Sequence, residues 1–265
     1  MLEFHSNIVR LGEVAFPRFS GTRILMMPII LGDMDSIPQE LAHYKPLLSD
    51  LFAMQPYEGE VGYITIDEKA VEPGKTHRRR GIHVDGFEPS SAADKMIASG
   101  SWAGGDGSGS WGGGWYKAPG TPDDKRRPNQ PSPNKPKKLD LSGEVFNSTK
   151  GTGMLSVSSH VGCRAWNQWF TGVPYLQGEC EHMREQCRDE ASLLLEENTV
   201  YWMDPYCVHE SLEQSQNTNR QFLRLSLPSQ CGWFEGCTVN PLGVMPTGPI
   251  MPRRELFMSE RPELF

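Results

Sequence analysis

The sequence predicts a mostly β fold with flanking helices, in the form of a β-sandwich or jelly-roll barrel. Seven short segments are rich in β-branched and aromatic residues and are bounded by Gly, Pro, Asn or Asp, as strands and their turns are. The 27 Gly and 21 Pro of the 265 residues also indicate many turns. A parallel α/β sheet would need a helix between successive strands, and most of these segments have none.

The expected elements follow in chain order. Near the N-terminus, Ser36 can cap a helix, Pro38 suits its first turn, and apolar residues recur at helical spacing from Leu41 to Leu51. A second helix is expected over 179–195. The predicted strands cover 61–68, 81–87, 153–159, 163–170, 198–204, 207–211 and 221–229.

The length suits a single domain over 1–265, in which residues 1–60 supply helical and strand support. A net charge of −7 disfavours a general nucleic-acid coat protein. No apolar run approaches the roughly 18 residues of a membrane span, and no export signal is evident, so we expect a soluble, cytoplasmic protein with reduced cysteines. The sequence carries no signal for an oligomeric state.

Residues 98–143 differ in composition from the rest of the chain and are expected to form an insert. Their first part is rich in Gly and Ser and contains Trp102, Trp111 and Trp115, while the second part is rich in Pro and Lys. Seven Lys or Arg against two Asp give 117–138 a local charge of +5. The segment is interpreted as a flexible surface loop, or alternatively as a lid or a docking strip for an anionic partner.

Residues with metal-binding chemistry occur on two of the predicted strands. The period of two along a strand places His83 and Asp85 on one face, and His209 occurs on a later strand. Two histidines and one carboxylate on one side of a metal leave three coordination positions open, as in non-haem Fe(II) oxygenases.

The last predicted strand adds a cation to this pattern. Arg224 and Ser226 share one face, opposite a face of leucines, and a buried guanidinium requires an anion. A cosubstrate that carries a carboxylate would satisfy it.

The order His-x-Asp, distant His and Arg-x-Ser resembles the Fe(II)/2-oxoglutarate-dependent oxygenase superfamily, over about residues 62–229. The resemblance implies a double-stranded β-helix with His83, Asp85 and His209 as iron ligands. It also implies that Arg224, helped by Ser226, pairs with the distal carboxylate of 2-oxoglutarate. Arg220, which has the same strand parity, is the alternative anchor.

Four further residues are candidate substrate contacts. Arg80 is the last of three arginines, with Arg78 and Arg79, before His83. One of the three could line the mouth of the site and hold an anionic substrate group, although a solvated basic turn is the simpler interpretation of each. Arg164 and Trp166 share a strand face that could border the iron, and Trp115 lies in the insert. His160 has no acid two positions on and is interpreted as a capping or surface residue.

The resemblance implies an oxygenase that uses Fe(II), 2-oxoglutarate and O₂ to hydroxylate or otherwise oxidise a small organic substrate, releasing succinate and CO₂. One alternative is the same chemistry on a nucleic acid or a protein, tethered by the basic strip; the acidic net charge disfavours it. Another is a non-catalytic binding module that uses the insert as its interaction surface.

Overall fold

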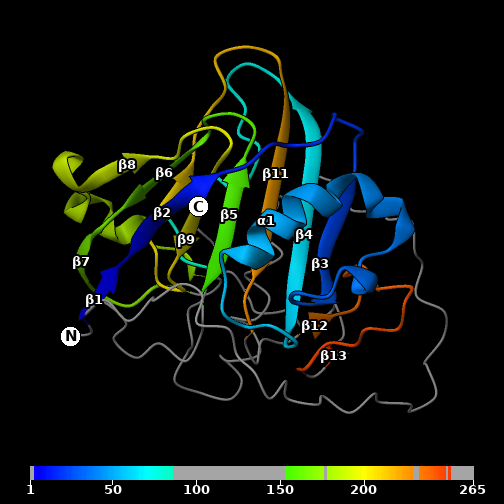
Figure 1. The fold of residues 1–265 in the computed structure, drawn as a ribbon. Helices are drawn as coiled ribbons and strands as arrows, with labels where there is room; N and C mark the ends of the chain where they lie inside the picture. Colours follow the sequence, from blue (N-terminus) through cyan, green and yellow to red (C-terminus); the bar gives the residue numbers. More distant parts are fainter. Residues whose placement is uncertain (1–2, 86–152, 176–177, 229–232, 249, 252–265) are drawn as a thin grey trace.

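The computed structural model describes residues 3–85, 153–175, 178–228, 233–248 and 250–251. It is mostly β, with antiparallel sheets and one short α-helix, as the composition of the predicted segments indicates (Figure 1). The described strands form separate sheets and do not close into a barrel. The predicted insert over 98–143, with Trp102, Trp111 and Trp115, lies outside these residues.

A six-stranded sheet is the centre of the fold, in the order β2-β9-β5-β11-β4-β3. Its members are β2 (Ile8–Glu13), β9 (Thr199–Met203), β5 (Met154–Ser158), β11 (Thr218–Ser226), β4 (Val61–Val71) and β3 (Arg23–Ile30). β11 is central and pairs antiparallel with both β4 and β5. The predicted strand that carries Arg220 and Arg224 therefore lies between two strands that are distant from it in the sequence.

Alternating side chains give this sheet two different faces. On one face, Leu223 and Leu225 join Ile64, Leu155 and the buried leucines of α1 (Lys45–Ala53) in the largest apolar cluster. Figure 1 shows α1 lying across this face in front of β11 and β4. The helix buries its apolar stripe there, so the opposite face is left to form the site.

A three-stranded sheet stands beside that opposite face, in the order β10-β6-β8. It consists of β10 (His209–Ser211), β6 (Cys163–Trp166) and β8 (Ser192–Leu194). His83 forms an isolated antiparallel bridge with His209 and another with Glu179. These bridges fix the segment that carries His83 and Asp85 against the edge of the small sheet.

Two-stranded pairs complete the described architecture. β1 (Glu3–Ser6) pairs antiparallel with β7 (Gln168–Thr171), and β12 (Trp233–Phe234) pairs parallel with β13 (Ile250–Met251). No described helix is both long enough and apolar enough to cross a bilayer.

Most predicted strands are present, but two predicted segments are organised differently. The segment 163–170 is divided between β6 and β7, which belong to different sheets; between them, the Asn167 amide donates to Ala191 O instead of continuing a ladder. The predicted strand over 81–87 is reduced, within its described part, to the bridges at His83.

The helix predicted over 179–195 is wrong. The segment forms two short 3-10 helices, η5 (Glu181–Gln186) and η6 (Asp189–Ala191), followed by β8. Only Cys180 and Met183 are buried at its start, too few to form the apolar stripe of an amphipathic helix, and Ser192–Leu194 pair with β6 instead.

The predicted N-terminal helix is present only in its second half. The chain first forms the 3-10 helices η1 (Met34–Ser36) and η2 (Gln39–Tyr44), and α1 begins at Lys45 with Pro46 in its first turn. Leu41 has non-helical backbone angles, φ −101° and ψ 15°, which interrupt the single helix that the leucine spacing indicates. Ser36 does not cap α1; its hydroxyl instead donates to Asp33 O.

Candidate metal centre

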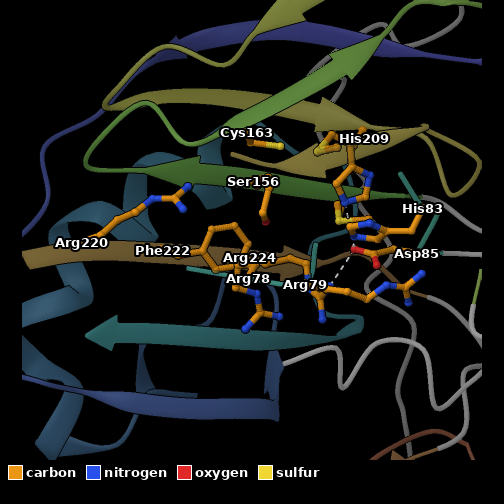
Figure 2. Close-up of a pocket in the computed structure, with 13 residues that line it drawn as sticks. Arg78, Arg79, His83, Asp85, Ser156, Cys163, His209, Arg220, Phe222 and Arg224 are labelled. Atoms are coloured by element: carbon orange, nitrogen blue, oxygen red, sulfur yellow. Dashed lines mark hydrogen bonds and ion pairs between the residues drawn. The ribbon is translucent and has the colours of Figure 1, made fainter. Parts of the chain in front are cut away.

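His83, Asp85 and His209 converge at one end of a cavity between the two sheets (Figure 2). One potential ligand atom from each residue lies within 4.8 Å of the others. His209 Nε2 is 3.8 Å from Asp85 Oδ2, and the two imidazole ring centroids are 4.3 Å apart. Two nitrogens and one oxygen at this spacing can bind one divalent ion.

The backbone orients both imidazoles in the same way. His83 Nδ1 is 2.9 Å from Gly81 O, and His209 Nδ1 is 2.9 Å from Cys207 O. Because a carbonyl oxygen only accepts, each Nδ1 carries the proton and each Nε2 keeps a lone pair. Burial lowers the pKa of both His83 and His209, so both rings are neutral and available as ligands.

Asp85 is held ionised by its surroundings. Burial alone would raise its pKa, but the Arg224 guanidinium, together with His209, His83 and Arg79, outweighs burial and holds the pKa below its usual value. Arg224 Nη1 donates to Asp85 Oδ2 over 2.8 Å. The carboxylate therefore has a fixed cationic partner and an ionised second oxygen.

Four arginines line the same cavity, namely Arg78, Arg79, Arg220 and Arg224, together with Ser156, Cys163, Phe222 and other side chains from both sheets. Figure 2 shows Arg224 and Arg79 beside Asp85, and Arg220 at the other end. Arg220 and Arg224 are four residues apart on β11, which separates their Cα atoms by about 13 Å. The cavity thus has one end with the candidate metal ligands and a second cationic end.

Arg220 is the cation at the second end, and it is 1% exposed. Its Nε donates to Ser158 Oγ over 2.8 Å, whereas its buried Nη1 has no hydrogen-bond partner among the described residues. Burial lowers its pKa to about 10, so it is still charged at neutral pH. An unpaired buried guanidinium nitrogen is costly unless a ligand satisfies it.

Gly162 makes room for this guanidinium. A Cβ atom added at Gly162 would lie 2.5 Å from Arg220 Cζ and 2.7 Å from Nη1, closer than any ordinary contact. The absence of a side chain at position 162 therefore allows Arg220 to occupy its present position.

Behind the cavity, Asp67 on β4 is surrounded by two arginines and a histidine. Its Oδ2 lies 3.1 Å from Arg78 Nη1 and 3.3 Å from His77 Nε2, and its Oδ1 lies 3.3 Å from Arg23 Nε. Arg78 also lies over the Phe222 ring, 5.0 Å from its centroid. This cluster ties the chain that leads to His83 onto the main sheet.

The predicted metal ligands are thus brought together, but several predicted neighbours are not. Arg80 points outward and pairs with Glu213 over 2.8 Å, while Arg78 and Arg79 line the cavity. Ser226 is buried two residues beyond Arg224, and its Oγ has no hydrogen-bond partner among the described residues, but it does not line the cavity. Trp115 lies outside the described residues. His160 is exposed, as expected.

The predicted orientation of β6 is wrong. Cys163 lines the cavity, whereas Arg164 does not, and Trp166 packs with Phe4 and Phe170 in a separate apolar cluster. Ala165 lies opposite His209 and packs against residues of the main sheet. The small side chains of β6 face the main sheet because the two sheets approach closely there, and the bulky ones face away.

Sequence reasoning missed Ser156 and Phe222, which line the cavity, and Gly162, which lies against Arg220. Ser156 has the polar parity of MLSVS, and Phe222 shares the parity of Arg220 and Arg224, so strand alternation could have indicated both lining residues. The role of Gly162 depends on a contact across the sheet and leaves no local pattern. The five described cysteines are free thiols, as expected.

No family model matches the sequence, and comparisons with curated proteins and with solved structures find no match either.

Proposed function

We propose that the protein is an Fe(II)- and 2-oxoglutarate-dependent oxygenase that acts on a small organic substrate. The observation that carries the proposal is the convergence of His83, Asp85 and His209 in a cavity whose other end holds the unpaired guanidinium nitrogen of Arg220. A metal site and an anion site in one cavity match a cosubstrate that chelates a metal and also carries a distant carboxylate.

The donor set fits the metal. Two neutral imidazoles and one carboxylate satisfy a divalent first-row ion without saturating it, which leaves positions for a bidentate 2-oxo acid and for O₂. Bound iron would supply the oxidative decarboxylation of 2-oxoglutarate and the oxidation of the substrate. The chain's own residues hold the ion: the carbonyls of Gly81 and Cys207 orient the imidazoles, and Arg224 orients the carboxylate.

The contacts favour Arg220 over Arg224 as the anchor for the distal carboxylate, contrary to the preference drawn from the sequence. Arg224 already donates to Asp85, and a guanidinium next to a metal ligand is poorly placed to grip the far end of a chelated diacid. Arg220 has an unsatisfied nitrogen and lies away from the triad. A carboxylate there would complete its hydrogen bonds.

The arrangement of the sheets supports the same proposal. The six-stranded sheet and the small β10-β6-β8 sheet lie on the two sides of the cavity, as the two walls of a double-stranded β-helix would. We propose this fold as the finer description of the β architecture.

The direct test measures succinate formed from 2-oxoglutarate by the full chain with Fe(II) and ascorbate in air. We expect turnover in the wild type and a loss of at least about 100-fold in His83→Ala, because the metal loses one of three protein ligands. His160→Ala is the matched control, since this exposed histidine lies outside the cavity. Equal turnover in His83→Ala and the wild type would contradict the proposal.

The anchor is tested by comparing Arg220→Gln with Arg224→Gln. We expect Arg220→Gln to raise the KM for 2-oxoglutarate by about 10-fold or more while metal affinity is retained. Arg224→Gln should instead weaken metal binding, because Asp85 loses its partner. The opposite assignment of these two effects would return the anchor role to Arg224.

A further inference from the structure

A single peptide unit connects the His83 imidazole with a carboxylate outside the cavity. His83 Nδ1 donates to Gly81 O over 2.9 Å, and Ile82 N, which belongs to the same peptide unit as that carbonyl, donates to Glu181 Oε2 over 3.1 Å. Because a peptide unit is planar, a contact that holds its N–H in one direction also fixes the direction of its C=O. The Glu181 carboxylate therefore fixes the carbonyl that orients His83.

Gly81 allows the carboxylate to approach this peptide unit. Its φ of +76° lies in the left-handed region, where a side chain is strained, and a Cβ atom at this position would lie 3.1 Å from Glu181 Oε2. The adjoining residues 82–84 form backbone hydrogen bonds with His209 on one side and with residues 178–180 on the other. The Glu181 side chain thus adds one more hydrogen bond to the ladder that holds the segment carrying His83.

Arg184 holds Glu181 in this position and joins it to the strand of the other histidine. Arg184 Nε and Nη2 both donate to the Glu181 carboxylate, and Nη2 also lies 2.9 Å from Glu210 Oε2. Glu210 follows His209 on β10, so one guanidinium connects the segments that carry the two imidazoles. The hydrogen bond from Arg184 lowers the pKa of Glu181, which is therefore ionised at neutral pH.

We propose that Glu181 is a positioning residue of the metal site, which sets the direction of His83 Nε2 through the peptide unit between Gly81 and Ile82. Glu181 does not line the cavity and acts through this contact. The inference rests on the candidate metal site of the proposed function. A ligand nitrogen that already points to the metal position needs no rearrangement on binding, so loss of its support should lower the metal affinity.

The test measures the Mn(II) affinity of the full chain by calorimetry. Glu181→Ala removes the acceptor of the Ile82 N–H and should weaken Mn(II) binding about 10-fold. Glu181→Gln removes the same charge but keeps an acceptor oxygen, so its affinity should stay within about threefold of the wild-type value. Glu185→Ala is the matched control, because it removes an exposed carboxylate from the same 3-10 helix; it should leave the affinity unchanged.

Three further measurements separate positioning from charge and from stability. Arg184→Gln removes a positive charge, which by Coulomb attraction alone would strengthen the binding of a cation, whereas loss of the support should weaken it. The side chains of Arg184 and Glu181 are 42% and 46% exposed, so their ion pair should add little to stability and the urea midpoints should stay near that of the wild type. At saturating Mn(II), the electron paramagnetic resonance spectrum, which reports the ligand geometry, should change in Glu181→Ala and not in Glu185→Ala.

The outcomes separate the inference from the proposed function. If Glu181→Ala binds Mn(II) as tightly as the wild type, or Glu181→Gln binds it as weakly as Glu181→Ala, the inference is overturned and the proposed function stands. Tighter Mn(II) binding in Arg184→Gln would also overturn the inference. If the wild type binds Mn(II) but forms no succinate with Fe(II), the proposed activity fails, whereas a loss of affinity confined to Glu181→Ala and Arg184→Gln still supports the inference. The absence of Mn(II) binding in the wild type would overturn both.

Discussion

Two adjacent carboxylates on the six-stranded sheet point to opposite faces and have different surroundings. Glu68 points to the face covered by α1, where it accepts hydrogen bonds from the neutral donors Ser20, Thr22, Tyr44 and Gln221. Asp67, the preceding residue, points to the cavity face and lies among Arg23, Arg78 and His77. Both carboxylates belong to residues that are 2% exposed.

The difference distinguishes a structural polar cluster from a binding site. The Glu68 cluster is complete: its donors and acceptor satisfy each other and fix the N-terminal segment on the sheet. On the cavity face, Arg220 Nη1 has no hydrogen-bond partner among the described residues. The first arrangement needs no further group, whereas the proposed anionic cosubstrate would complete the second.

Neutralising each carboxylate in turn should give the largest difference in unfolding free energy between the two faces. Asp67→Asn removes the buried counter-charge of Arg78 and should cost about 3–5 kcal/mol of unfolding free energy. Glu68→Gln keeps an oxygen that can accept from the same neutral donors and should cost about 1–3 kcal/mol. Urea unfolding of the two variants measures both values; a larger cost for Glu68→Gln would contradict the distinction.

Lowering the pH should reduce the free energy of unfolding through His77, which lies on the cavity side of the sheet. Burial lowers the pKa of His77 to about 4, against 6.5 in an exposed histidine, so unfolding takes up a proton between these values. Stability therefore falls as the pH decreases from about 6.5 to about 4, and this residue contributes about 3 kcal/mol of the loss.

The pH effect is isolated by comparing the wild type with His77→Gln. The difference between their unfolding free energies should be constant above about pH 7 and should shift in favour of the variant as the pH falls. If this difference does not change between pH 7 and 5, His77 has the same pKa in the folded and the unfolded protein, which would contradict the prediction.

The same Gly→Ala change should have different effects on the two faces. A Cβ at Gly162 collides with the Arg220 guanidinium, so Gly162→Ala should weaken 2-oxoglutarate binding about 10-fold while Mn(II) affinity stays unchanged. Gly12→Ala meets only the flexible end of Met54, at 3.1 Å, and should leave both affinities as they are. Calorimetry with Mn(II) and 2-oxoglutarate measures these values; unchanged cosubstrate binding in Gly162→Ala would separate Arg220 from the anchor role.

The smallest change in unfolding free energy is expected for a substitution of Arg80, which lies outside both faces. Its ion pair with Glu213 is exposed on both sides, so Arg80→Gln should change the unfolding free energy by less than about 1 kcal/mol. A larger loss in urea unfolding would mean that the arginine run acts as a unit rather than through its separate partners.

The sequence predicted what depends on strand alternation. The β class, most strands and the shared parity of Arg220 and Arg224 follow from the period of two. The convergence of His83, Asp85 and His209 follows from one His-x-Asp pair and one distant histidine. These signals are local, so they can be recognised in the sequence without knowing how the sheets pack.

The errors arose where packing between elements decides the outcome. Alternation alone does not show which face of β6 meets the main sheet, so it places Arg164 and Trp166 on the side that Cys163 occupies. The 179–195 segment has helical composition, but pairing of Ser192–Leu194 with β6 overrides it. Gly162 acts through a contact with a residue 58 positions away, which no local pattern reveals.

The central claim is that His83, Asp85 and His209 form one metal site, and a Mn(II) titration of the purified full chain tests it most directly. Calorimetry or electron paramagnetic resonance should find one tightly bound ion per chain in the wild type and in His160→Ala, and a loss of at least about 100-fold in affinity in Asp85→Ala. The absence of stoichiometric binding in the wild type, or equal affinity in Asp85→Ala, would contradict the account.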